Sequence, residues 1–268
     1  MPFRLQTLWH RMGGRLQDKQ INWRWAAASA IGTAHLHSQT RLQDAYAVQS
    51  IDGVGMLAIL ADGAGSAEFG AQGAWMVCRY LVMQFRQWFA EQKELPTDET
   101  LLHWIGDLRG KISTSAEVRG TDSRQFAATL AVILITSDTI ITLQVGDSAI
   151  VARNNNEWDV LCWPENGEYA STTYFITEEP EPRLTISREE RVHDGFALFS
   201  DGIGELALSF ADRSAYAQFL DPMMRPVDAL QASGRDRDLS QKLQLFLESP
   251  RVCDRTDDDK TLILISGK

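Results

Sequence analysis

The chain has 268 residues, of which 44% are hydrophobic and 23% charged, so it can bury a sizeable core as a globular protein. A formal net charge of −10 argues against a binder of the nucleic-acid backbone, which needs a basic face. Three widely spaced cysteines, Cys78, Cys162 and Cys253, fit neither a zinc site nor a disulfide framework, and no apolar run is long enough to span a bilayer. We therefore expect a cytoplasmic protein with reduced thiols and no membrane span.

The N-terminal residues 1–22 are predicted to form an arm that precedes a single domain over residues 23–268. Leu5, Leu8 and Trp9 fall at helical spacing among arginines, a pattern that also occurs in membrane-surface helices. The Gly13-Gly14 pair interrupts this pattern, which favours docking or disorder of the arm.

The first half of the domain is predicted to contain three strands followed by two helices. Hydrophobic runs punctuated by glycine and aspartate predict the strands, and apolar residues at intervals of three and four predict the helices. Thr97 is the expected N-cap of the second helix. The strands are expected at 22–32, 44–51 and 53–63, and the helices at about 66–92 and 97–118.

The second half is predicted to return to strands. The short gaps between its first four strands predict hairpins. A polar, proline-bearing excursion with one short strand follows over 164–184. The strands are expected at 126–136, 139–148, 149–158, 158–163, 195–202 and 261–267, with helical segments over about 209–247.

The grouping of helices apart from strands indicates the fold class. Alternating strands and helices would predict a parallel doubly wound sheet, and this chain does not alternate them. We expect an α+β protein with a four-layer α-β-β-α sandwich, in which two central antiparallel sheets are flanked by helices.

Aspartates recur at the predicted strand ends. One Asp-Gly after a strand usually marks a turn, but strand ends in packed sheets cluster at one rim, so several such acids predict a shared site. Grouped carboxylates repel unless cations neutralise them, and Mg²⁺ and Mn²⁺ prefer oxygen ligands. No cluster of histidine and cysteine competes for zinc. The acids are Asp44, Asp62, Asp147, Asp201 and Asp258, the last within the run Asp257–Asp259.

The residues after Asp62 are small. Gly63 allows a sharp turn and offers its carbonyl oxygen as a ligand, and the run from Ala64 to Ala67 is expected to leave room for a substrate.

Six segments of this chain, taken in order, resemble the metal-dependent protein phosphatases of type 2C, and the resemblance covers about residues 23–266. The segments are GTAHLHSQTRLQDA, ILADGAGS, AATLAVILI, QVGDS, ALFSDGI and DDDKTLILI. The form QDA, in place of the commoner ED, is similar to a bacterial branch of that family.

The resemblance implies a role for each acid and a two-metal site at one edge of the sandwich. Asp62 corresponds to the carboxylate that bridges two ions, with the Gly63 carbonyl beside it. Asp201 and Asp258 correspond to ligands of one ion, and Asp44 to the acid that holds metal-bound waters. Asp147, with Asp201, corresponds to the site of a weaker third ion in some members. The polar stretch over about 154–183 corresponds to the family's flap, which helps to shape substrate recognition.

Three positions depart from the family pattern. Gln43 stands where many relatives have a glutamate, and Ala64 where the animal enzymes have a histidine thought to protonate the leaving group. The arginine that binds phosphate has no match in register, and Arg41 is the nearest candidate. His35 is our candidate for the general acid, because the segment GTAH leads out of a strand whose end should reach the site. The alternatives are a proton from a metal-bound water and a purely structural role for His35.

The predicted function is hydrolysis of phosphoserine and phosphothreonine in proteins by a water that two Mg²⁺ or Mn²⁺ ions activate. The expected partners are phosphorylated proteins and a cognate serine/threonine kinase, with the enzyme acting as a monomer. A catalytically silent module that binds or regulates a phosphoprotein or kinase is the alternative, and a small phosphorylated metabolite is an alternative substrate. An aspartyl-phosphate enzyme is disfavoured, because ADGAG lacks the second acid of an Asp-x-Asp motif.

Overall fold

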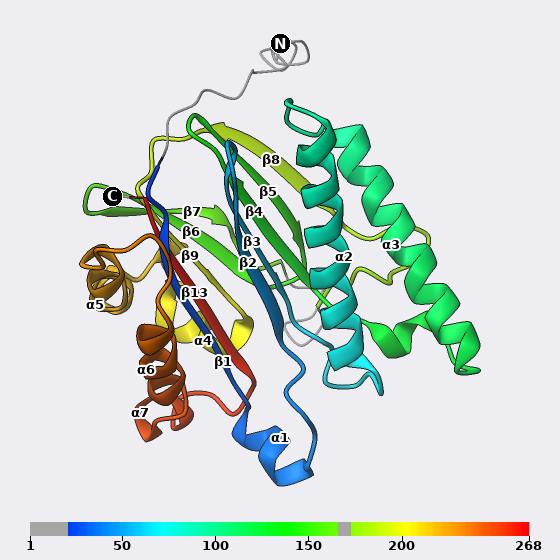
Figure 1. Cartoon of the computed structure of the whole chain (residues 1–268). Coiled ribbons are helices and arrows are strands. Elements are labelled where there is room, and N and C mark those ends of the chain that lie inside the picture. Colours follow the sequence, from blue (N-terminus) through cyan, green and yellow to red (C-terminus); the bar gives the residue numbers. More distant parts are fainter. Residues whose placement is uncertain (1–20, 166–172, 268) are drawn as a thin grey trace, which may run out of the picture.

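The computed structural model describes residues 21–165 and 173–267, so nearly all of the predicted arm over residues 1–22 lies outside the described residues. Two β-sheets pack face to face, and helices cover the outer face of each (Figure 1). This arrangement confirms the predicted α+β, four-layer α-β-β-α sandwich. No helix in the described ranges is both long and apolar enough to cross a bilayer.

The first sheet has the strand order β12-β1-β13-β9-β6-β7. Its pairs are antiparallel except that of β12 with β1. The strands are β1 (Arg24–Ala30), β6 (Ala149–Asn154), β7 (Glu157–Cys162), β9 (Gly195–Phe199), β12 (Gly234–Arg235) and β13 (Lys260–Ser266). Its outer face is covered by α4 (Asp201–Ala207), α5 (Ala217–Asp228), α6 (Arg237–Leu247) and α7 (Pro250–Cys253).

The second sheet has the order β2-β3-β4-β5-β8, with every pair antiparallel. Its strands are β2 (Ala45–Ile51), β3 (Gly55–Ala61), β4 (Leu130–Ile135), β5 (Thr139–Val145) and β8 (Thr185–Glu190). Its outer face packs on α2 (Gly70–Glu91) and α3 (Asp98–Val118). Thr97 caps α3 as predicted, because its hydroxyl accepts the Thr100 N–H.

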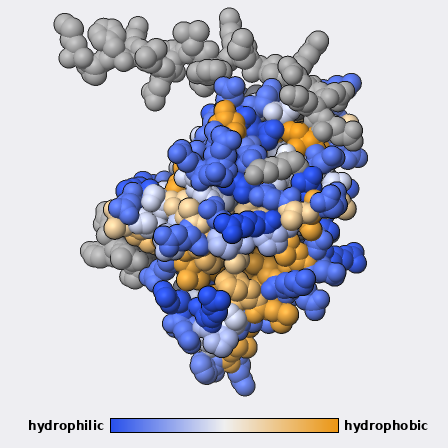
Figure 2. Space-filling view, turned by 90° about the vertical axis from the view of Figure 1, so that its left-hand side faces the viewer, coloured by the Kyte–Doolittle hydropathy of each residue, from blue (hydrophilic) through white to orange (hydrophobic). Residues whose placement is uncertain are grey.

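Apolar side chains fill the space between the sheets. Leu60 and Ile133 of the second sheet meet Leu198 and Ile263 of the first in one buried cluster. The strands that supply them are apolar on both faces, because one face meets the other sheet and the other face meets helices. On the side of α5–α7, Figure 2 shows a surface that is largely hydrophilic, with an apolar patch below its middle.

Several predicted boundaries differ from the structure. A short helix, α1 (Thr33–Ser38), follows β1, and the 3₁₀ turn η1 (Ser123–Phe126) precedes β4. α2 begins at Gly70 rather than near Ser66. The segment 209–247 is broken by the paired strands β10 (Leu208–Ser209) and β11 (Ser214–Ala215) and by β12.

The predicted excursion also differs in detail. The β6–β7 hairpin occupies most of 149–162, so the irregular part of the predicted flap begins only after Cys162. The described part of 164–184 contains no named strand, and the unpredicted strand β8 starts directly after it. Residues 166–172 of the flap lie outside the described residues.

One predicted hairpin was wrong, and the difference shapes the site. β5 and β6 are separated only by residues 146–148, yet they lie in different sheets. The chain crosses between the sheets here, and Gly146 adopts φ +94°, a backbone conformation that favours glycine. A methyl group on Gly146 would lie 2.7 Å from both the Tyr174 carbonyl oxygen and Thr129 Cγ2. The crossing therefore needs glycine for its conformation and for its close contacts.

We expect Gly146→Ala to lower the free energy of unfolding by about 2–4 kcal/mol, through backbone strain and crowding together. Gly53→Ala is the matched control, because Gly53 also has positive φ (+70°) but has open space around it. That variant should lose only about 1–2 kcal/mol. Urea unfolding followed by tryptophan fluorescence measures both, and equal losses would contradict the importance of crowding at the crossing.

Candidate metal centre

The strand register brings the predicted acids to one rim of the sandwich. Asp44 directly precedes β2 and Asp62 directly follows β3, and the pairing of Ala45 with Ala61 places both at the same edge. Asp147 lies in the crossing after β5, whose end pairs with the start of β4. In the other sheet, Phe199 at the end of β9 pairs with Ala149 and Leu262, so Asp201 and Asp258 reach the same rim.

Asp62 lies at the electrostatic centre of this group. Burial raises its pKa well above the usual value, and the negative charges of four other carboxylates raise it further. Those four are Asp44, Asp201, Asp258 and Asp147. The structure thus brings together all five acids that the sequence analysis selected. We call Asp44, Asp62, Asp147, Asp201 and Asp258 the carboxylate rim.

Asp44 has one satisfied and one unsatisfied oxygen. Ser200 Oγ and Thr261 Oγ1 donate to its Oδ2 at 2.8 and 2.7 Å, whereas Oδ1 is buried without a hydrogen-bond partner. Burial is the main reason why the pKa of Asp44 rises to about 6. The buried Oε1 of the adjacent Gln43 also has no partner. Two buried oxygen acceptors at one rim lack a donor, which is the environment that a cation or its bound water would complete.

Asp201 is the first residue of α4 and retains access to solvent. Loss of hydration among the neighbouring protein atoms is the first cause that raises its pKa to about 7, and the charges of Asp147, Asp258 and Asp44 follow. Asp62 lies within hydrogen-bonding reach of both Asp44 and Asp201.

Asp147 is held by the excursion that follows β7. The hydroxyl of Thr173 donates to its Oδ2, and the Glu165 N–H donates to the Gly146 carbonyl at 3.0 Å. Glu165 and Thr173, the described residues on either side of 166–172, therefore both contact the crossing that carries Asp147. Burial raises the pKa of Asp147, and the Thr173 hydroxyl partly offsets that rise.

The loop after Asp62 is fixed by its backbone. The Gly63 and Ala64 N–H groups donate to the carbonyls of Gln43 and Ala127 at 3.2 and 2.9 Å. A Cβ on Gly63 would overlap the Gly70 backbone, so glycine is required at the point where α2 begins. Only part of the run of small residues leaves an open approach. Gly65, Ser66 and Ala67 line a cavity of about 530 Å³, whereas Ala64 does not line it and is buried against Ala127.

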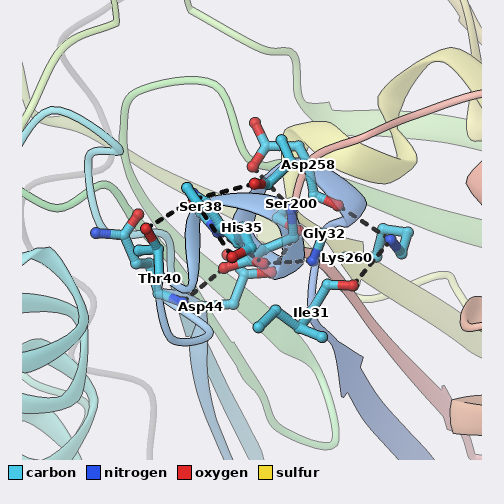
Figure 3. Close-up of polar contacts among 12 residues, drawn as sticks. Ile31, Gly32, His35, Ser38, Thr40, Asp44, Ser200, Asp258 and Lys260 are labelled. Atoms are coloured by element: carbon cyan, nitrogen blue, oxygen red, sulfur yellow. Dashed lines mark hydrogen bonds and ion pairs between the residues drawn. The ribbon is translucent and has the colours of Figure 1, made fainter.

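Asp259 is a structural centre that the sequence analysis did not separate from its acidic neighbours. Its carboxylate accepts the backbone N–H groups of Gly32 and Gln43, both at 2.6 Å, and lies 3.0 Å from His35 Nδ1. Nearby, the buried Lys260 ammonium donates to the carbonyls of Ile31 and Asp258 at 3.3 and 3.1 Å. Figure 3 shows this network joining α1 to the start of β13. These contacts fix the segment that carries Asp258.

The other three histidines in the described residues lie outside the contacts around Asp259. His193 pairs with Asp159, and His103 pairs with Asp107 on α3. His37 is exposed on α1, two residues beyond His35. Of these four histidines, His35 is the one that contacts Asp259.

The rim fits divalent cations that prefer oxygen. Its side-chain donors are carboxylates, and the unpartnered oxygens of Asp44 and Gln43 lie among them. Within residues 21–165 and 173–267, no three histidine, cysteine, aspartate or glutamate side chains already form a closed ligand set.

The profile of the family described as Protein phosphatase 2C matches residues 31–248. This chain belongs to the protein phosphatase 2C family. Serine/threonine-protein phosphatase 3 of Escherichia coli (strain K12) is 33% identical to it over 251 residues, covering 91% of this chain and 98% of that relative.

Solved structures share the protein phosphatase 2C fold at low sequence identity. Serine/threonine phosphatase Stp1 from Staphylococcus aureus aligns with a TM-score of 0.63 and 16% identity, covering 96% of this chain and 100% of that one. The catalytic domain of serine threonine protein phosphatase PstP, solved with two manganese ions, aligns with a TM-score of 0.62 and 17% identity. That alignment covers 92% of this chain and 99% of the other.

The raised pKa of Asp44 predicts a dependence of stability on pH in the metal-free enzyme. A carboxylate with a raised pKa in the folded state stabilises the fold below its unfolded-state pKa near 3.8, and this contribution is lost as the pH rises through about 6. Asp44→Asn keeps an oxygen that can accept from Ser200 and Thr261 and removes the charge. With chelator present at pH 7.5, the free energy of unfolding of Asp44→Asn, measured by urea denaturation, should therefore exceed that of the unmodified chain by on the order of 1–3 kcal/mol.

That difference should shrink towards zero at pH 4. The exposed Asp52 supplies the control Asp52→Asn, which should show no such pH-dependent gain. An equal effect of Asp44→Asn at both pH values would contradict the charge-repulsion interpretation.

Proposed function

We propose that the carboxylate rim binds two Mg²⁺ or Mn²⁺ ions and that the enzyme uses this centre to hydrolyse phosphoserine and phosphothreonine in proteins. The supporting observation is the group of mutually repelling carboxylates at one rim, with a buried, unpartnered Asp44 oxygen, found in a member of the protein phosphatase 2C family. Bound divalent cations supply a water of lowered pKa and neutralise charge on the phosphoryl group.

Each rim residue has a proposed role. Asp62 and the Gly63 carbonyl would hold the ions from the loop that hydrogen bonds to Gln43 and Ala127 keep in place. Asp201 and Asp258 would hold them from the opposing sheet. Asp44, oriented by Ser200 and Thr261, accepts hydrogen bonds from water through its free oxygen.

Asp147 is proposed to form, with Asp201, the site of a weaker third ion. The charge of Asp147 is the first Coulombic contribution to the raised pKa of Asp201, so these two carboxylates are coupled. Thr173 already donates to one oxygen of Asp147, which leaves fewer free acceptors for a cation than Asp62 has. The excursion that holds Asp147 is thus proposed to act as the flap of this enzyme.

The substrate is proposed to enter beside the loop after Asp62. The cavity there is lined by Gly65 and Ser66 and by Arg41 and Gln43 from the segment before β2. Arg41 is exposed, and its guanidinium supplies a positive charge for an anionic phosphate next to an otherwise acidic rim.

The cellular setting is also a proposal. Three free cysteines, two of them buried, agree with a reducing cytoplasm. We propose that the enzyme acts there as a monomer, whose open rim admits a folded phosphoprotein, and that a serine/threonine kinase produces its substrates.

The proposal predicts that metal binding and activity depend together on Asp62. The unmodified chain should hydrolyse p-nitrophenyl phosphate only with added Mn²⁺ or Mg²⁺, and chelator should abolish the reaction. Asp62→Asn should lower turnover by about a thousandfold and weaken Mn²⁺ binding in calorimetry, because an anionic ligand of both ions is lost.

The matched control is Asp257→Asn, a change in the exposed acid next to Asp258. It should leave both measurements within about threefold of the unmodified chain. Full activity after exhaustive chelation, or an Asp62→Asn variant that binds Mn²⁺ normally, would contradict the proposed centre.

A further inference from the structure

Hydrolysis of a serine or threonine phosphate needs a proton for the departing alkoxide, and position 64 supplies none. Ala64 is buried in an apolar cluster with Ala67 and Ala127. An alkoxide is a poor leaving group without general-acid catalysis, which contributes about 10²–10⁴-fold to rate. The proposed function therefore requires a proton donor elsewhere near the loop after Asp62.

His35 lies beside that loop although it is distant in sequence. Its Nε2 is 4.0 Å from the position that a Cβ on Gly65 would occupy, and Gln43 Oε1 is 3.9 Å from the same point. Gly65 and Gln43 both line the same cavity, and in the sequence they lie three residues after Asp62 and directly before Asp44. His35 Nε2 therefore lies beside the loop that follows Asp62.

The other ring nitrogen is fixed by a buried carboxylate. His35 Nδ1 lies 3.0 Å from Asp259 Oδ1, although the N–H is not well aligned on that oxygen. Asp259 is 1% exposed and is itself held by the Gly32 and Gln43 N–H groups. A carboxylate beside Nδ1 selects the tautomer with hydrogen on Nδ1, which leaves Nε2 as the nitrogen that gains and releases a proton.

The His35 side chain is largely buried but still reaches solvent. Its side chain is 16% exposed, so solvent can return a proton to the ring while the contact with Asp259 limits its orientation. Figure 3 shows His35 among the contacts that join α1 to the start of β13. This is the combination that a general acid needs, namely a ring of fixed orientation with one nitrogen facing the reacting group.

We propose that His35 is the general acid of this phosphatase and that Asp259 is the residue that positions it. The proposal rests on the proposed function and adds the source of the leaving-group proton. As water attacks phosphorus, the bond from phosphorus to the serine oxygen breaks and its electron pair stays on that oxygen. The oxygen takes the proton from Nε2 and leaves as a serine hydroxyl, and solvent then reprotonates Nε2.

The decisive variant is His35→Asn. The asparagine amide can keep a donor near Asp259 in place of Nδ1, but it removes Nε2. Turnover of a phosphoserine peptide should fall by about a hundredfold or more. Turnover of p-nitrophenyl phosphate should change by less than about threefold, because nitrophenolate leaves without needing a proton. Mn²⁺ binding in calorimetry should be unchanged.

His37→Asn is the matched control on the same helix, since His37 is exposed. It should leave both substrates and Mn²⁺ binding unaffected. His35→Gln provides a second variant with the same expected substrate dependence if His35→Asn does not fold.

Two results would overturn the proposal for His35 alone. Retained phosphoserine turnover in His35→Asn would show that the ring only tethers α1 to Asp259. Equal losses on both substrates would show that it acts through the metal centre or the fold. Absence of metal-dependent hydrolysis in the unmodified chain would instead overturn the proposed function, and the role of His35 with it.

Discussion

Repulsion among five carboxylates at one rim is the constraint on which the rest of this structure depends. Each of Asp44, Asp62, Asp147 and Asp201 has a pKa raised by burial, and like charges raise the pKa values of all four further. A folded protein gains nothing in stability from such an arrangement. The arrangement is understandable if a cation occupies the rim during function, because the same charges that destabilise the empty site then supply its affinity.

The sandwich is built to withstand that repulsion. Neutral hydroxyls of Ser200 and Thr261 hold Asp44 from the first sheet, while strands β2 and β3 of the second sheet carry Asp44 and Asp62 themselves. Asp259 and Lys260 tie the start of β13 to the backbone of Gly32 and Ile31, the two residues that join β1 to α1. The rim is therefore held by contacts that cross between the sheets, and local turns alone would not fix it.

The sequence predicted the layers and the acids at the rim because these leave local signals. Asp62 and Asp201 each end an apolar run and precede a glycine, which marks the end of a buried strand. The crossing at residues 146–148 was misread as a hairpin, since gap length does not reveal whether two strands share a sheet. Strand β8 was missed because it lies at a sheet edge and its residues, TISREE, are mostly polar.

Other features of the site depend on tertiary partners that the sequence does not show. Asp259 is one acid in a run of three, and only the fold separates its role from that of Asp258. Ser200 and Thr261 became recognisable as partners of Asp44 only once β9 and β13 were placed beside each other. The start of α2 was predicted too early because the loop from Asp62 to Phe69 is held by Gln125 and Ala127, which lie far away in the sequence.

The most direct test of the carboxylate rim as a metal centre is anomalous diffraction from crystals of this chain grown with Mn²⁺. We expect two strong anomalous peaks on either side of the Asp62 carboxylate, one of them within ligand distance of Asp201 and Asp258. Crystals grown with saturating Mn²⁺ that show no anomalous peak at the rim, or peaks only elsewhere on the protein, would contradict this expectation.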